Sequence, residues 1–83
     1  MILSSGETCA VEAYFGLEGE ITPRRFTWHG RMLSVEGVGR QWQEDGERCF
    51  VVLAAGGRPF ELRLDEDALL WRVCCLSTSG MAA

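Results

Sequence analysis

Glycine-containing pairs cut this chain into short alternating runs, and this punctuation limits the fold more than any other feature. Pairs suited to tight β-hairpin turns occur at His29-Gly30, Asp45-Gly46 and Gly56-Gly57. The runs between them alternate with a period of two and show no helical pattern of useful length. The sequence therefore predicts an all-β fold of five or six bent antiparallel strands, with an SH3-like barrel and an open sheet both compatible.

The length of the chain restricts it to one small domain. Its 83 residues, of which 47% are hydrophobic and 24% charged, suit a single globular unit rather than a disordered chain. We expect one domain over residues 1–83, with an ordered core at about 8–76 and a flexible tail at 77–83. Residues 9–15 and 69–76 alternate as end strands, and residues 16–23 read as a loop.

The first hairpin is predicted in detail, because glycine adopts positive φ freely and histidine is enriched there. A two-residue turn sets Trp28 opposite Arg31, Phe26 opposite Leu33 and Arg24 opposite Val35. Phe26, Leu33 and Val35 then share the core face. Trp28 and Arg31 lie at its rim, where the guanidinium is expected to stack on the indole.

The following strand must change register. Leu33 and Val35 are inward at odd numbers, whereas Val38 and Trp42 are expected inward at even ones. A β-bulge at Gly37 or Gly39 is the predicted cause.

The later hairpins follow the same logic. A two-residue turn at Gly56-Gly57 pairs Leu53 with Phe60, Val51 with Leu62 and Cys49 with Leu64, and we expect that face to be the core. Phe50 and Val52 then point to the side of Glu61 and Arg63. At Asp45-Gly46 a two-residue turn would set Glu44 against Glu47, so a longer loop is also open.

Enzyme and metal motifs are missing from the sequence. The single histidine, His29, lies at a turn tip, and no nucleophile or phosphate-binding motif occurs, so we predict no catalytic residue and no cofactor. The four cysteines, Cys9, Cys49, Cys74 and Cys75, lack zinc spacing and are expected to be buried free thiols. A metal- or redox-responsive module is a weaker alternative. The start of the chain lacks a secretory pattern, so we expect a cytoplasmic protein.

Tryptophan and arginine supply the candidate binding residues: Trp28, His29, Arg31, Arg24, Arg25, Arg40 and Trp42. The tryptophans are either core residues or the lining of a groove that holds a peptide or stacks bases. A net charge of −4 argues against non-specific binding to nucleic acid or anionic membranes.

The string PRRFTWHGR from Pro23 to Arg31, together with Trp42, the Phe-Glu-Leu at 60–62 and Trp71, resembles a bacterial domain family of unknown function. That family occurs as small stand-alone proteins and at the end of some Y-family translesion DNA polymerases. The chain departs from it at Gly56-Gly57, where an Asp-Gly-like turn is expected, and at Met32, where an aromatic is common. The resemblance implies a β-rich accessory module near DNA repair, without assigned catalytic residues.

The leading functional hypothesis is a non-enzymatic protein-interaction module of a bacterial protein, with no membrane contact. Its protein partner would bind an exposed sheet edge or the Trp/Arg rim. The alternative is a single-stranded nucleic-acid-binding accessory domain linked to DNA repair. That alternative requires Arg24, Arg25, Arg31 and Arg40 to converge on one face.

Overall fold

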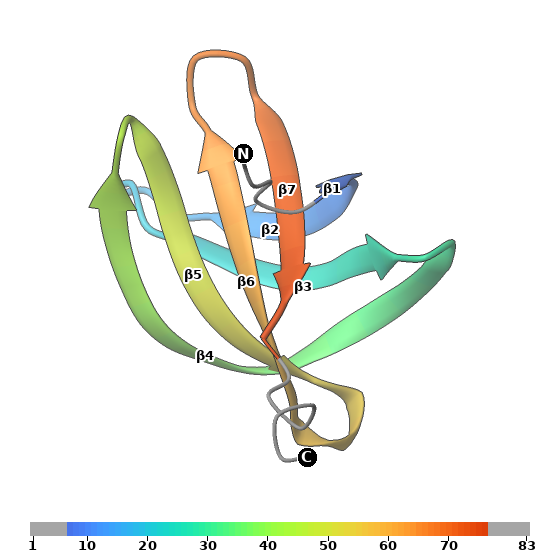
Figure 1. Cartoon of the computed structure of the whole chain (residues 1–83). Coiled ribbons are helices and arrows are strands. Elements are labelled where there is room, and N and C mark those ends of the chain that lie inside the picture. The colour runs from blue at the N-terminus through green and yellow to red at the C-terminus, as the bar shows by residue number, and fades with distance from the viewer. Residues whose placement is uncertain (1–6, 77–83) are drawn as a thin grey trace.

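The computed structural model describes residues 7–76 and folds them into one curled antiparallel sheet (Figure 1). Its strands are β1 (Glu7–Cys9), β2 (Val11–Phe15), β3 (Ile21–Trp28), β4 (Arg31–Glu44), β5 (Glu47–Ala54), β6 (Arg58–Asp65) and β7 (Leu70–Cys75), with a short 3₁₀ turn, η1, at Ala55–Gly57. The strand order is β1-β7-β6-β5-β4-β3-β2. The sheet curls into a half-barrel, which confirms the all-β prediction. The predicted tail at 77–83 lies outside the described residues.

The sheet is a meander whose first strand returns to its last. Each strand from β2 to β7 pairs with the next one in sequence, and β1 pairs with β7. Ala10 separates β1 from β2, and both of its backbone groups bond to Thr27 of β3: its N–H donates to Oγ1 and its carbonyl accepts the Thr27 N–H, each at 3.0 Å. The predicted strand at 9–15 is thus broken, and the described residues form seven strands, where the sequence predicts five or six.

Two of the predicted turns have the expected geometry. His29 and Gly30 have φ of 50° and 79°, and Asp45 and Gly46 have φ of 52° and 80°, as a two-residue hairpin turn of the I′ type requires. The pairs Trp28–Arg31 and Phe26–Leu33 form as predicted. Glu44 also faces Glu47, so the tight turn is used despite the like charges.

The predicted pair of Arg24 with Val35 does not form, since the pairing of β3 with β4 ends at Arg25 and Ser34, and Arg24 lies in a bulge of β3. Opposite β2, the register jumps from Arg25 to Pro23, which leaves Arg24 as the extra residue. Ile21 and Pro23 before the bulge and Phe26 after it are therefore all buried, although their numbers change parity. Arg24 is exposed, and the predicted loop ends at residue 20 because Ile21 already belongs to β3.

A bulge in β4 is confirmed, but a second one corrects the orientation of Trp42. The register shifts between Val35 and Gly37 and again between Val38 and Gln41. The first shift brings Val38 to the inner side opposite Val52, as predicted. The second restores the original parity, so Trp42 faces outward, opposite Cys49.

The predicted faces of β5 are reversed, because the turn into β6 is one residue longer than expected. Ala54 pairs with Arg58, so Ala55 joins the two glycines in a three-residue turn. Val52 then faces Phe60 and Phe50 faces Leu62, and all four are buried. The predicted core residues Val51 and Leu53 lie on the outer side, since a one-residue slip moves every side chain to the other face.

The core fills the inner side of the half-barrel. Its buried members are Ile21, Phe26, Phe50, Val52, Ala54, Phe60, Leu62, Leu64 and Val73. Phe26 and Phe60 meet edge to face with ring centroids 5.0 Å apart. No helix within residues 7–76 has the length and hydrophobicity needed to cross a bilayer.

Candidate functional site

The tip of the β3–β4 hairpin holds Trp28, His29 and Arg31, but their contacts differ from the prediction. The indole of Trp28 stacks on the His29 ring at 4.0 Å between centroids and meets Phe60 edge-on at 5.2 Å. Within the described residues Arg31 makes no cation–π contact with that indole. His29 Nε2 lies 3.6 Å from Glu7 Oε2. Trp28 is therefore partly buried against the core and partly exposed at the rim of the sheet.

The second group of predicted site residues lies on the outer side of the β2–β3 hairpin. Arg24 lies over the ring of Tyr14, with its Cζ 5.8 Å from the centroid. Arg25 donates from Nε to Glu12 Oε1 at 3.0 Å. Both arginines are exposed, so this surface presents an aromatic ring between positive and negative groups.

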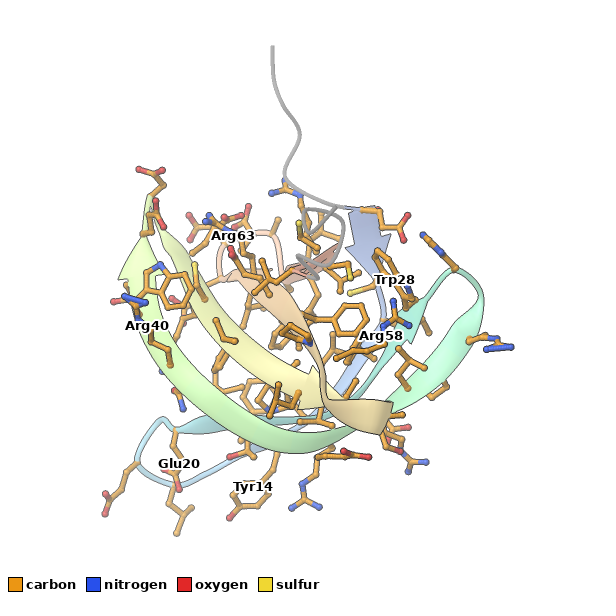
Figure 2. All side chains as sticks on the ribbon, turned by 60° about the horizontal axis from the view of Figure 1, so that its bottom comes forward. Tyr14, Glu20, Trp28, Arg40, Arg58 and Arg63 are labelled. Carbon is orange, nitrogen blue, oxygen red and sulfur yellow. The ribbon has the colours of Figure 1, made fainter. Side chains whose placement is uncertain are left out.

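Arg40 and Trp42 form the third group, on the outer side of β4. The Arg40 guanidinium lies 5.4 Å from the Trp42 ring, and Trp42 Nε1 donates to Glu44 Oε1 at 2.9 Å. Arg40 and Trp28 lie on opposite sides of the view in Figure 2. The structure thus divides the predicted binding residues among three separate places and does not bring the four arginines together.

The outer side of β5 and β6 carries a network centred on Arg63. Its guanidinium donates to Glu61 at 2.6 Å, to Glu47 at 3.1 Å and to Glu44 at 3.3 Å. The hydrogen bond from Trp42 and the positive charge of Arg63 lower the pKa of the Glu44 carboxyl. This network offsets the repulsion between Glu44 and Glu47 and engages each nitrogen of the Arg63 guanidinium.

The four cysteines are free thiols, as predicted, but only Cys49 is fully buried, so the predicted burial is wrong for Cys9, Cys74 and Cys75, which are partly exposed. Burial, with a smaller contribution from Glu7, raises the pKa of Cys9 to about 11. Burial also raises the pKa of Cys49 and of Cys74. These thiols are therefore protonated and weakly nucleophilic at neutral pH. Within residues 7–76 no group of three or more His, Cys, Asp or Glu side chains is placed to hold a metal ion.

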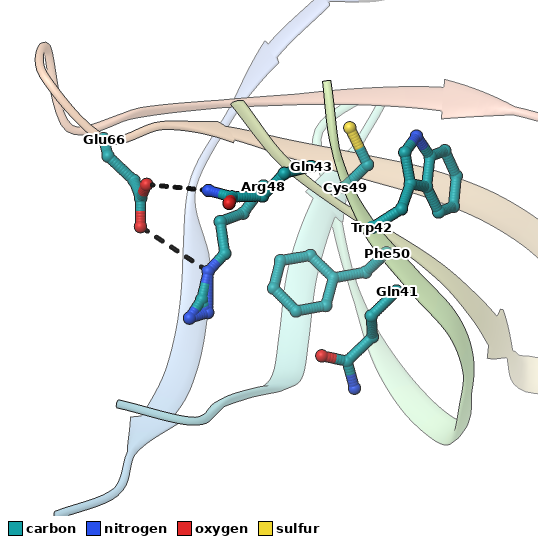
Figure 3. A pocket seen from close by; sticks show the side chains of 7 residues that line it. All are labelled: Gln41, Trp42, Gln43, Arg48, Cys49, Phe50 and Glu66. Atoms are coloured by element: carbon teal, nitrogen blue, oxygen red, sulfur yellow. Dashed lines mark hydrogen bonds and ion pairs between the residues drawn. The ribbon is translucent and has the colours of Figure 1, made fainter. Parts of the chain in front are cut away.

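A cavity of about 420 Å³ lies beside the β4–β5 hairpin (Figure 3). Its walls are formed by Gln41, Trp42, Gln43, Arg48, Cys49, Phe50 and Glu66. Arg48 donates to the Gly19 carbonyl at 2.8 and 3.3 Å, and its Nε lies 3.5 Å from Glu66 Oε2. The guanidinium is therefore already engaged, and it ties the β2–β3 loop to the β6–β7 turn.

The sequence predicts the strand that contains β2, but it does not predict the exposed apolar side chains on and after that strand. Tyr14 and Phe15 on β2 and Leu17 just after it are 51%, 62% and 103% exposed, which is unusual for three large apolar residues so close together. The adjacent Tyr14 and Phe15 could have indicated this, because neighbours in a strand point to opposite faces and both are bulky.

The backbone of β2 is also unpaired along one edge. Within residues 7–76, β2 pairs with β3 alone. Ala10 and Gly16 flank β2, and the backbone hydrogen bonds of both are made toward β3: Ala10 bonds to Thr27, and the Gly16 N–H donates to the Glu20 carbonyl. Because alternate residues of an antiparallel strand direct their N–H and C=O to the same side, those of Val11, Ala13 and Phe15 point away from β3.

A scan against protein-family models and searches of curated proteins and of solved structures found no match for this chain. The resemblance to the polymerase-associated domain family therefore remains a prediction.

Proposed function

We propose that this chain is a non-enzymatic protein-interaction module that accepts an extended segment of its partner along β2. The observation that carries the proposal is the free edge of β2, where Val11, Ala13 and Phe15 offer unpaired backbone groups. An added strand gains affinity from main-chain hydrogen bonds and specificity from alternate side chains. The edge therefore supplies the polar part of such an interface.

The exposed side chains supply the apolar part. Proteins usually protect a sheet edge with lysine, proline or a covering element, whereas β2 carries only the single charged residue Glu12. Tyr14 and Phe15 present rings on its two faces. Burying one such side chain contributes roughly 1.5–3 kcal/mol, so a short strand covered on both faces can hold a partner.

Single-stranded nucleic acid is the second candidate, and Arg24 over Tyr14 supports it. A base can stack on the ring while the guanidinium contacts a phosphate. The surrounding charge favours the first proposal, because Glu12 lies on the same hairpin and the whole chain carries −4. A fluorescence titration with oligonucleotides at rising salt separates the two candidates, since only phosphate binding weakens steeply.

Site-specific photo-crosslinking tests the first proposal. A photoreactive phenylalanine replaces Phe15 in one sample and Met32, which is similarly exposed on β4, in a control sample. We expect a defined protein crosslink from position 15 and none from position 32. Ala13→Pro should abolish that crosslink, because proline removes the outward N–H of β2. Equal crosslinking at both positions, or crosslinks that ignore Ala13→Pro, would contradict the proposal.

A further inference from the structure

We infer that the segment accepted by β2 is the β2 strand of a second copy of this chain, so that two half-barrels join across a two-fold axis at Ala13. This inference rests on the proposed function, since it requires the β2 edge to be an interface. A two-fold pairing is self-complementary by necessity, so the same short strand must satisfy itself. The backbone, the charges and the apolar side chains of β2 each meet that condition in one register.

The backbone restricts the possible registers. The outward groups belong to Val11, Ala13 and Phe15, and antiparallel hydrogen bonds form only when outward residues face outward residues. The registers that keep most of β2 paired are therefore centred on Glu12, Ala13 or Tyr14.

Charge selects among these registers. Centring on Glu12 would set its carboxylate against the same carboxylate of the second copy, which is unfavourable. Centring on Tyr14 would bring the two Arg24 guanidinium groups, which lie over the two tyrosine rings, toward each other. Centring on Ala13 instead places Glu12 opposite Tyr14 of the second copy, with the Arg24 of that copy above the ring. Arg25 uses only Oε1 of Glu12, so Oε2 can accept from this second arginine.

The apolar side chains fit the same register. With Ala13 on the axis, Val11 faces Phe15 of the second copy, and the pair occurs twice by symmetry. Aromatic and β-branched side chains make favourable cross-strand pairs. Phe15, which is 62% exposed in one chain, gains a cover, and the small side chain of Ala13 lets the strands approach at the axis.

Sedimentation equilibrium of the full chain over a range of concentrations tests the inference. We expect a monomer–dimer equilibrium in the native protein and a monomer at every concentration for Ala13→Pro. The proline removes no bond to β3, because the Ala13 N–H points away from that strand. Circular dichroism and tryptophan fluorescence would confirm that the variant is folded.

Charge variants test the register itself. Arg24→Glu should weaken dimerisation about tenfold, because two symmetric attractive contacts become repulsive. Adding Glu12→Arg to that variant should recover most of the loss. Arg31→Glu, an equal charge change at the exposed hairpin tip, is the matched control and should leave the equilibrium unchanged.

A native chain that stays monomeric, or a dimer that ignores Ala13→Pro and Arg24→Glu, would overturn the inference. A monomer whose position 15 still crosslinks to a different protein would leave the proposed function standing. A monomer without any such crosslink would end both.

Discussion

At the scale of single residues, Arg63 shows how one side chain permits a local conflict. The tight turn at Asp45-Gly46 sets Glu44 against Glu47, which the sequence marks as unfavourable. Arg63 contacts both carboxylates and Glu61 as well, and each of these groups except Glu44 is largely removed from water. The turn is therefore stabilised by a residue far from it in sequence.

Replacing Arg63 with methionine should lower the free energy of unfolding by about 1–3 kcal/mol, because charged hydrogen-bond partners would be left without their donor. Urea denaturation measures the change. Arg63→Lys, which keeps the charge but cannot contact three carboxylates in a plane, should lose a smaller part. Equal stability of native protein and the methionine variant would show that the network contributes nothing.

Cys9 makes stability depend on alkaline pH. Its thiol has a pKa of 9.0 when unperturbed and about 11 in the folded chain. Between these values the unfolded chain loses the proton while the folded chain keeps it, so the free energy of unfolding falls as pH rises through this window. Cys49 and Cys74 shift in the same direction.

The Cys9→Ala variant should show a shallower fall over this pH range, with part of the slope kept by the other two thiols. Urea unfolding at several pH values from neutral to alkaline measures it. Identical slopes in the two proteins would mean that Cys9 titrates alike in the folded and unfolded chains.

At the scale of elements, turn length decides which residues form the core. The three-residue turn Ala55–Gly57 puts Phe50 and Val52 inside, whereas a two-residue turn would put Val51 and Leu53 there. Both sets are apolar, so the pattern of β5 alone does not choose between them. The difference lies in one backbone residue.

Deleting Gly57 tests this dependence. The shorter turn would force β5 and β6 out of their native register, and the loss of two buried side chains at roughly 1.5–3 kcal/mol each is a large part of a small domain's stability. We expect loss of the cooperative thermal transition, measured by circular dichroism. The control Gly57→Ala keeps the length, has open space for its Cβ, and should cost about 1–2 kcal/mol for its positive φ. A deletion variant as stable as this control would contradict the account.

The two hairpins show what the sequence could and could not predict. At His29-Gly30 both turn residues adopt positive φ, so the pair fixed the turn and with it the register of Phe26. At Gly56-Gly57 the same kind of pair belongs to a longer turn, and its first residue, Ala55, carries no distinguishing signal. In β4 the sequence offers Gly37 and Gly39 as alternative places for one bulge, but the structure has a bulge beside each of them, so the prediction puts Trp42 on the wrong face.

The candidate site was beyond sequence reasoning for a different reason. The sequence correctly predicts a strand over Val11–Phe15, but the place of this strand at the edge of the sheet depends on the break at Ala10. There the chain passes from its pairing with β7 to its pairing with β3, and nothing in the local sequence marks that change. An edge is a property of the assembly of strands and not of the strand itself.

At the scale of the whole molecule, the two edges of the curled sheet are joined at Ala10, which connects β1, paired with β7, to β2, paired with β3. The Thr27 hydroxyl accepts a hydrogen bond from Ala10, and the Arg48 guanidinium donates to the Gly19 carbonyl in the β2–β3 loop. Between these two ties β2 presents its outer edge without a partner among the described residues. The interface that we propose is the stretch where the curled sheet ends.

Amide hydrogen exchange of β2, followed by NMR at low and high protein concentration, tests this central claim most directly. In dilute protein the amides of Glu12 and Tyr14, which face β3, should exchange slowly, and those of Val11, Ala13 and Phe15 should exchange fast. At high concentration the second set should become protected as the second copy binds. Protection of all five amides at every dilution would show that the edge is already covered within one chain and would contradict the account.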